Sequence, residues 1–187
     1  MLGCVIMASG HSKRFGEDKL FFLVDGVPMV QRALEVIPPG VFDSVAVVFR
    51  DNRLSNMASK RGFAAVLNPD STGDSSITIR LGLSAMPDGL QGCMFMVCDQ
   101  PQLTTDSICR LAEAFHASPH SITRLAFENR EGNPVIFPAA LFEELLTLPP
   151  FETGRFVLSR HRSLVQCIQA SEESELIDVD SPDDLPS

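Results

Sequence analysis

A segment near the start of the chain combines small residues with positive charge in a pattern suited to binding phosphate. The small residues 8–10 follow an apolar run at 4–7, so no bulky side chain keeps a ligand away from the backbone. Successive amide groups in such a turn can form a concave anion site, and positive charge follows at Lys13, Arg14 and Lys19. The segment therefore predicts a phosphate-binding loop.

The glycine spacing differs from the two best-known phosphate-binding motifs. Five residues separate Gly10 from Gly16, where a Walker A motif has four, and the dinucleotide-binding pattern G-x-G-x-x-G is missing here. The alternative interpretation is an ordinary strand-to-helix turn with solvated Lys and Arg side chains. The density of positive charge favours the phosphate loop.

A carboxylate after a later apolar run indicates a metal site. Residues 92–97 read as a buried strand, and Asp99 lies two residues beyond it. A carboxylate at the tip of a central parallel strand is costly to bury alone, so it predicts a metal ion or a hydrogen-bond donor. Mg²⁺ fits, because it binds one or two carboxylates together with phosphate oxygens. As an alternative, Asp99 could cap the helix expected from Thr104, although a cap normally lies closer to its helix.

The composition predicts a globular protein that binds a small anion. The chain has 187 residues, 44% of them hydrophobic, and a formal charge of −9, which argues against nucleic-acid binding. No apolar run has the length of about 18 residues that a transmembrane helix needs. Five cysteines without a C-x-x-C pair suit a reducing cytosol. We therefore expect a single cytoplasmic domain over residues 1–187.

Apolar runs and helical patterns alternate along the first half of the chain. The expected strands occupy residues 4–7, 20–24, 44–49, 63–67 and 92–97, and the expected helices begin near residues 28, 53 and 74. Such alternation predicts a mostly parallel sheet, with a ligand site at the carboxyl ends of its strands. Ser75 or Ser76 could cap the helix that begins near residue 74 or contact the ligand, and the two roles are compatible.

The second half of the chain is expected to continue the same architecture. Helices are expected at 105–115, 139–146 and 153–161, strands at 121–127, 164–168 and 176–179, and a tight turn at 132–134 before a further strand. A terminal helical turn is expected at 181–184.

These motifs resemble the molybdenum cofactor nucleotidyltransferase family, most closely its cytidylyltransferase and molybdenum hydroxylase accessory branch. The family opens with Leu-Ala-Ala-Gly, Arg-Met/Phe-Gly and Lys, which Met7-Ala8-Ser9-Gly10, Arg14-Phe15-Gly16 and Lys19 match. Later motifs match in the same order at residues 68–69, 73–77, 98–101, 132–135 and 178–185. Ser9 replaces the second Ala, Asn133 stands where many members have His, and the loop before Gly73 is short. Ser9 and that loop bear on base choice, and Asn133 bears on how the second substrate is held.

The resemblance implies a three-layer Rossmann-like α/β domain that transfers a nucleotidyl group, with CMP favoured. The donor would be CTP or another nucleoside triphosphate, the acceptor the phosphate of molybdopterin, the cofactor Mg²⁺, and a molybdenum hydroxylase a further partner. The implied catalytic residues are Arg14, Lys19 and Asp99. The implied nucleotide-binding residues are Met7, Ala8, Ser9, Gly10, Asn68, Ser75 and Ser76, and the implied metal ligands are Asp99 with Asp178 or Asp180.

Two alternative functions remain at this point. One is a nucleotidyltransferase that acts on another phosphorylated acceptor, such as a sugar phosphate. The other is a non-catalytic carrier that binds the finished cofactor and passes it to a hydroxylase. The combination of Arg14, Lys19 and Asp99 favours an enzyme, because a carrier has no need of all three.

Overall fold

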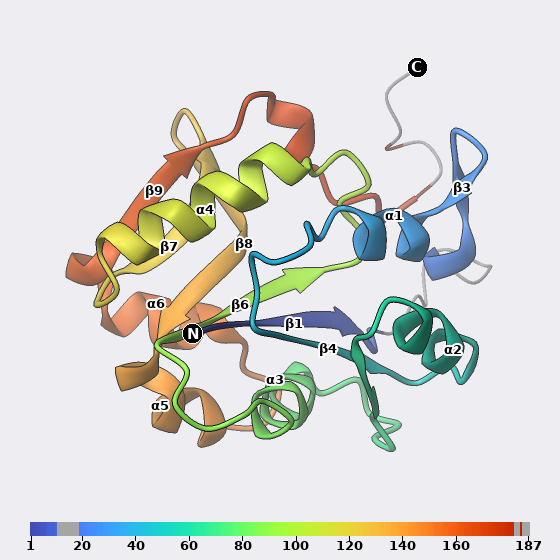
Figure 1. Cartoon of the computed structure of the whole chain (residues 1–187), viewed down its shortest axis with the longest axis horizontal. Coiled ribbons are helices and arrows are strands. Elements are labelled where there is room, and N and C mark those ends of the chain that lie inside the picture. Colours follow the sequence, from blue (N-terminus) through green and yellow to red (C-terminus); the bar gives the residue numbers. More distant parts are fainter. Residues whose placement is uncertain (11–18, 182–183, 185–187) are drawn as a thin grey trace.

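The computed structural model describes residues 1–10, 19–181 and 184, and its main element is a seven-stranded sheet (Figure 1). The strand order across the sheet is β5-β4-β1-β6-β8-β7-β9. The strands are β1 (Leu2–Ala8), β4 (Ser44–Phe49), β5 (Ala64–Leu67), β6 (Gly92–Val97), β7 (Ile122–Phe127), β8 (Arg130–Pro138) and β9 (Val165–Gln169).

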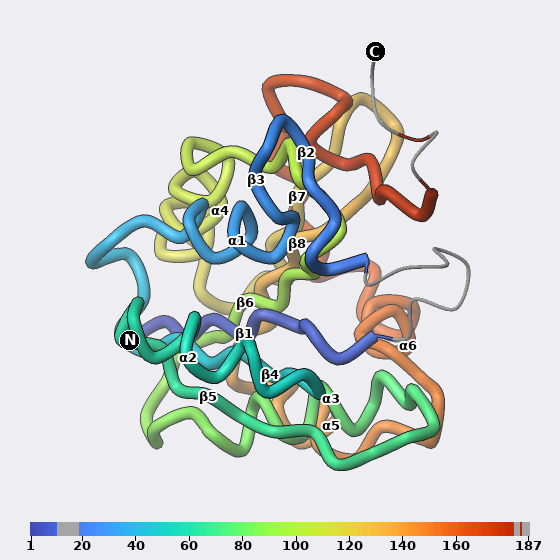
Figure 2. Tube along the Cα trace, turned by 90° about the vertical axis from the view of Figure 1, so that its right-hand side faces the viewer, coloured from blue at the N-terminus to red at the C-terminus, as the bar shows by residue number. Residues whose placement is uncertain are grey.

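The sheet is mostly parallel, as the alternation of strands and helices predicts. Strand β1 pairs in parallel with β4 and β6, β4 pairs in parallel with β5, and β7 pairs in parallel with β9. Only β8 runs against its neighbours β6 and β7 within the described residues. Figure 2 looks onto the edge of the sheet where the parallel strands of the first half end. Ligands of α/β proteins bind at this edge.

Helices cover both faces of the sheet and make a three-layer structure (Figure 1). One face carries α1 (Met29–Glu35), α2 (Arg53–Lys60) and α4 (Thr105–Ala117), and the other carries α3 (Ser75–Ser84), α5 (Phe142–Leu146) and α6 (Gly154–Arg160). Because strand residues alternate between faces, Cys4 and Ile6 pack in the first core and Val5 packs in the second. A strand buried on both faces needs a continuous apolar run, which explains why residues 4–7 read so clearly.

Short elements complete the chain. They are η1 (Lys19–Phe21), the antiparallel pair β2 (Leu23–Val24) and β3 (Val27–Pro28), η2 (Ala139–Leu141), η3 (Arg162–Leu164) and η4 (Glu173–Leu176). The extended run expected at 20–24 therefore begins as a 3₁₀ turn. The hairpin turn lies at Asp25 and Gly26, both with positive φ, directly after the extended run expected at 20–24.

Two expectations for the second half are wrong. The turn between β7 and β8 lies at Glu128 and Asn129, and residues 132–134 lie inside β8, where the Asn133–Pro134 peptide bond is cis. Residues 132–134 have the composition of a turn. A pairing irregularity opposite them, between Arg124 and Ala126 of β7, lets these residues remain within the sheet. Residues 176–179 form no strand: Leu176 is the last residue of η4, and the backbone N–H of Val179 donates to the carbonyl of Asp99.

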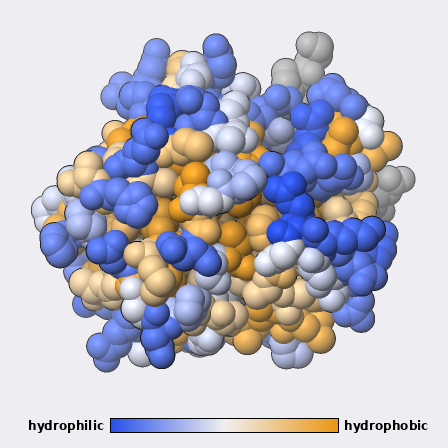
Figure 3. All heavy atoms as spheres, viewed as in Figure 1, coloured by the Kyte–Doolittle hydropathy of each residue, from blue (hydrophilic) through white to orange (hydrophobic). Residues whose placement is uncertain are grey.

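The terminal helical turn expected at 181–184 includes two residues that lie outside the described part of the chain. Within the described ranges, no helix is both long and apolar enough to cross a membrane. Figure 3 shows hydrophilic residues over much of one face with apolar ones among them. The large exposed apolar side chains come from separate elements, including Leu23, Leu67 and Phe151. Single exposed apolar residues of this kind are normal on a protein surface.

One buried carboxylate fastens the C-terminal segment to the rest of the fold. Glu175 of η4 is 1% exposed. Its Oε2 accepts hydrogen bonds from the backbone N–H (3.1 Å) and hydroxyl (2.7 Å) of Thr104, and its Oε1 accepts from the N–H of Ser171 (2.9 Å). Burial alone would raise the pKa of this carboxyl, but hydrogen bonds from Ser107, Thr104 and Ser171 outweigh it and hold the pKa below its usual value.

We predict that Glu175→Gln lowers the free energy of unfolding by about 1.5–3 kcal/mol at pH 7, because an amide group replaces one accepting oxygen. The folded pKa is lowered, so this stabilisation is present above the unfolded pKa and disappears as the pH falls through the folded value. Denaturant unfolding at pH 7 and at pH 3 measures both effects. Glu173→Gln on the same turn is the control, because Glu173 is exposed and pairs only loosely with Arg130 (3.5 Å). An equal loss of stability in both variants would contradict the prediction.

Candidate functional site

Three aspartates from two segments of the chain lie at the edge of the sheet where β6 ends. Asp99 follows β6, and Asp178 and Asp180 follow η4. The backbone N–H of Val179 donates to the carbonyl of Asp99 at 2.8 Å, which fixes the two segments side by side. Residues about 80 positions apart in the sequence therefore share one site, as the resemblance implied.

Lys19 links two of these carboxylates. Its Nζ donates to Asp99 Oδ2 at 2.9 Å and to Asp180 Oδ1 at 2.8 Å, and its side chain is 11% exposed. Partial burial disfavours the charged form of Lys19, but the hydrogen bonds to Asp180 and Asp99 outweigh it and raise the pKa of the ammonium group. Lys19 is therefore a fixed positive charge between two anions.

Asp178 has different surroundings from Asp180. It accepts a hydrogen bond from Gln100 Nε2 at 2.9 Å, whereas the Asp180 side chain is 62% exposed and contacts Lys19. Burial, followed by the negative charge of Asp99, raises the pKa of Asp178 above its usual value. Asp180 and Asp99 thus share the ammonium group of Lys19, whereas Asp178 is hydrogen-bonded to Gln100.

Asp99 and Asp180 are two carboxylates of the kind that bind a small hard cation. Asp99 Oδ1 is buried and has no hydrogen-bond partner in the described structure, so one oxygen remains for a further ligand. No group of three or more His, Cys, Asp or Glu side chains suited to a metal occurs in the described residues. A site with two carboxylates is what Mg²⁺ uses when phosphate oxygens complete its coordination.

The side chain of Ser9 points into the protein. Its hydroxyl shares a hydrogen bond with the hydroxyl of Thr78 on α3, and Asn68 Nδ2 lies 3.3 Å from both hydroxyl oxygens. All three residues are at most 5% exposed. This network joins the residues that follow β1, the residues that follow β5 and helix α3. Ser9 and Asn68 therefore hold together the elements that carry the site. Gly10 is exposed, and its backbone is open to a ligand.

Asp74 caps helix α3, so the alternative in which Ser75 or Ser76 caps this helix is wrong. Asp74 Oδ1 accepts from the N–H of Ser76 at 2.8 Å and from the N–H of Phe151 at 2.9 Å. Asp74 stands two residues before the amide that it accepts from, which is the spacing of an N-cap. Ser75 is the first residue of the helix and lines the smaller cavity described below. The hydroxyl of Ser76 is buried without a partner in the described structure.

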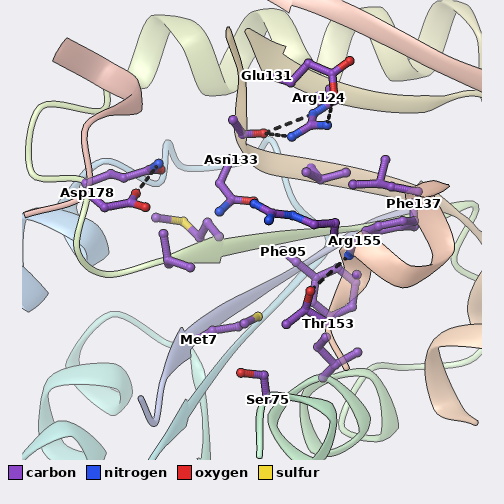
Figure 4. A pocket seen from close by; sticks show the side chains of 18 of the residues that line it. Met7, Ser75, Phe95, Arg124, Glu131, Asn133, Phe137, Thr153, Arg155 and Asp178 are labelled. Atoms are coloured by element: carbon purple, nitrogen blue, oxygen red, sulfur yellow. Dashed lines mark hydrogen bonds and ion pairs between the residues drawn. The ribbon is translucent and has the colours of Figure 1, made fainter. Parts of the chain in front are cut away.

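Two cavities lie at this edge of the sheet. The smaller, about 260 Å³, is lined by Gly10, Lys19, Asp99 and Asp180 among others. The larger, about 620 Å³, extends over β6, β8 and α6 (Figure 4). Met7, Ser75 and Val97 line both cavities and form a common wall.

The larger cavity has an apolar floor and a polar rim. Figure 4 shows Met7, Phe95 and Phe137 around it, with Asn133 and Arg155 directed toward one another. Arginines line it at positions 124, 130 and 155. The two cavities together can hold two substrates in contact at a shared wall.

The structure brings together most of the residues predicted for the site. Met7, Ser9, Gly10, Ser75, Lys19, Asp99 and Asp180 line the smaller cavity. Ala8, Asn68 and Ser76 are buried behind it, and Asp178 faces the larger cavity. Arg14 lies outside the described residues.

Sequence reasoning missed Thr78 and Arg155. Thr78 is a polar residue within the helical pattern of 77–86, and its position there was the available signal. Arg155 gave no signal, because its chemistry depends on the cavity that α6 and β8 form together.

Comparisons with known proteins agree with this geometry. A family model described as a MobA-like NTP transferase domain matches residues 4–165. A curated protein from Vibrio cholerae named molybdenum cofactor guanylyltransferase is 30% identical over 135 residues, which are 70% of this chain and 62% of that protein. The match thus spans less than two thirds of that relative.

Solved structures share the fold at low sequence identity. A nucleotidyl transferase from Methanothermobacter superposes with a TM-score of 0.82 at 21% identity, covering 98% of this chain and 94% of the other. Rv0371c of Mycobacterium tuberculosis in complex with manganese superposes with a TM-score of 0.76 at 20% identity, covering 98% and 95%.

The family model covers most of the chain, including the loop after β1 and the tip of β6 that build the candidate site. The chain belongs to the MobA-like NTP transferases, the family of the molybdenum cofactor nucleotidyltransferases.

Proposed function

We propose that the chain catalyses transfer of a nucleotidyl group from a nucleoside triphosphate to the phosphate of molybdopterin. The observation that carries this proposal is the ion pair of Lys19 with Asp99 and Asp180 at the rim of a small cavity that adjoins a larger one. The small cavity would hold the triphosphate and the large cavity the acceptor. The relative from Vibrio cholerae, a named molybdenum cofactor guanylyltransferase, supports the choice of acceptor.

The reaction requires two anions to approach each other. An oxygen of the acceptor phosphate forms a bond to the α-phosphorus of the nucleotide, the bond from that phosphorus to the bridging oxygen breaks, and pyrophosphate leaves. Such transfer depends on positioning and charge neutralisation more than on a covalent catalyst. Lys19, the exposed backbone of Gly10 and, by the family motif, Arg14 would hold the triphosphate.

Asp99 and Asp180 would hold the divalent cation. Asp99 has a buried oxygen without a partner, and Asp180 accepts from the same ammonium group as Asp99. The cation, which we expect to be Mg²⁺, would neutralise charge on the reacting phosphate. The similar mycobacterial protein in complex with manganese supports a divalent ion in this fold.

The proposed reaction gives Lys19 a further partner, the triphosphate, besides the two carboxylates that it contacts in the structure. In the structure its ammonium group neutralises Asp99 and Asp180. When a triphosphate enters the smaller cavity, Lys19 can turn to the phosphates, which frees both carboxylates for the cation. Nucleotide and divalent ion would therefore bind cooperatively.

We predict that Lys19→Met weakens triphosphate binding in the presence of Mg²⁺ by about tenfold or more, because a charge-assisted hydrogen bond is lost. The same variant should bind Mn²⁺ more tightly than the wild type when no nucleotide is present, because the ammonium group no longer competes. Isothermal titration with nucleotide, and electron paramagnetic resonance with Mn²⁺, measure the two effects. Lys60→Met on the exposed end of α2 is the control. Unchanged affinity for both ligands would place the triphosphate elsewhere.

The metal ligands can be separated by three amide variants. Asp99→Asn and Asp180→Asn should weaken Mn²⁺ binding, and Asp99→Asn should lower turnover by roughly 100-fold or more while metal-free nucleotide binding persists. Asp178→Asn should keep its Mn²⁺ affinity, since Asp178 accepts from Gln100 and no hydrogen bond joins it to Lys19 in the described structure. Turnover of Asp99→Asn near the wild-type rate would remove Asp99 from the metal site.

Two bases are supported for the donor nucleotide, each by a different observation. The sequence resemblance favours cytosine, and the named activity of the Vibrio cholerae relative favours guanine. The hydroxyl of Ser9 was a candidate contact to the base, but it bonds to Thr78 and Asn68. Base choice would then depend on backbone groups near Gly10 and on Ser75. Hydrogen bonds to a base edge can discriminate strongly, because a wrong base leaves buried polar groups unpaired.

Competition between CTP, GTP, ATP and UTP at equal concentration decides the base. With molybdopterin and Mg²⁺ present, we expect CTP or GTP to be consumed at least about tenfold faster than ATP and UTP. Pyrophosphate release and the identity of the dinucleotide product are the readouts. Release only with a sugar phosphate as acceptor would support the alternative enzyme, and no release with any acceptor would support the non-catalytic carrier.

A further inference from the structure

The larger cavity suits a second substrate of moderate size. Its volume of about 620 Å³ lies within the usual range for small-molecule sites, and it adjoins the triphosphate cavity along Met7, Ser75 and Val97. Under the proposed function the acceptor is a phosphate ester, so its reacting group carries negative charge. An anion that must approach a triphosphate needs a positive group on its own side.

Two of the three arginines of the larger cavity already have partners. Arg124 Nη1 donates to Glu131 Oε2 at 2.6 Å, and Arg124 Nη2 donates to the carbonyl of Gly132 at 3.0 Å. Arg130 donates to the carbonyl of Leu176 at 3.2 Å and lies 3.5 Å from a carboxylate of η4. Both guanidinium groups hold β8 and its neighbours in place.

Arg155 is different. Its backbone N–H donates to the Thr153 hydroxyl at 3.2 Å, but no carboxylate or carbonyl within the described ranges accepts from its guanidinium. Figure 4 shows its side chain extending from α6 into the cavity toward Asn133. The Asn133 amide likewise has no side-chain partner in the part of the chain that the structure describes. Two hydrogen-bond donors thus converge in one cavity.

The electrostatics of the cavity agree with an anion site. Burial lowers the pKa of the Arg124 guanidinium, the carboxylate of Glu131 opposes this, and the positive charges of Arg162 and Arg155 lower it further. The charge of Glu131 is shared between Arg124 and Arg162, which leaves the charge of Arg155 for a ligand.

We propose that Arg155, assisted by Asn133, binds the phosphate of the acceptor and holds it against the shared wall of the two cavities. This inference rests on the proposed function. Arg155 is thus a binding residue for the nucleophile, and Lys19 serves the triphosphate on the other side of the wall. An arginine suits this role because its planar fork can donate two parallel hydrogen bonds to one phosphate.

The test compares Arg155→Met with a matched variant on the same helix. Arg160→Met is the control, because Arg160 lies 3.6 Å from Glu144 and stacks near Phe156 outside the cavity. Arg155→Met should raise the KM for molybdopterin by about 10- to 100-fold, whereas the nucleotide Kd and the melting temperature stay near wild type. Arg155→Lys should restore part of the loss, and Arg160→Met should leave the KM unchanged.

Binding without turnover keeps this inference separate from the proposed function. Titration of molybdopterin into the nucleotide-free protein should show the same loss of affinity in Arg155→Met, even if no product forms. Absence of turnover in the wild type would refute the proposed function alone. Equal molybdopterin affinity in the wild type and Arg155→Met, or an equal loss in Arg160→Met, would overturn the role of Arg155.

Discussion

The fold places two carboxylates at one edge of the sheet, and their mutual repulsion is the main physical constraint on the site. Asp99 at the tip of β6 and Asp180 after η4 need a cation between them, and Lys19 supplies it. The pairing also ties η1, which begins at Lys19, to the C-terminal segment. Because the two carboxylates need a cation, the proposed reaction can exchange Lys19 for a divalent ion at this place.

The wall shared by the two cavities sets where the two substrates of the proposed reaction meet. Met7 and Ser75 stand at the ends of β1 and at the start of α3, both of which are fixed by core packing. The network of Ser9, Thr78 and Asn68 locks the same elements together below the surface. Nucleotide and acceptor can then meet at one line without large movements of the sheet, which favours reaction by reducing the entropy lost on approach.

Most of the fold follows from local patterns in the sequence. The runs at 44–49 and 92–97 coincide with β4 and β6, and the helix expected from residue 53 coincides with α2, because each is long and strongly patterned. The errors fall where tertiary contacts decide. Residues 132–134 have turn-forming composition but lie in β8, because both neighbouring strands pair with that strand. Three of the residues 176–179 are apolar, but in the described structure none of them pairs with a strand of the sheet.

The candidate site divides in the same way. The sequence by itself determined the candidate chemistry, since small residues before cations and an aspartate after a buried strand are local signals for Lys19 and Asp99. Only the tertiary structure decided which second carboxylate joins them, that the Ser9 hydroxyl faces inward, and that Arg155 enters a cavity. These outcomes depend on contacts between residues tens of positions apart. No local spacing encodes them, because they follow from how β1, β6, β8 and α6 pack together.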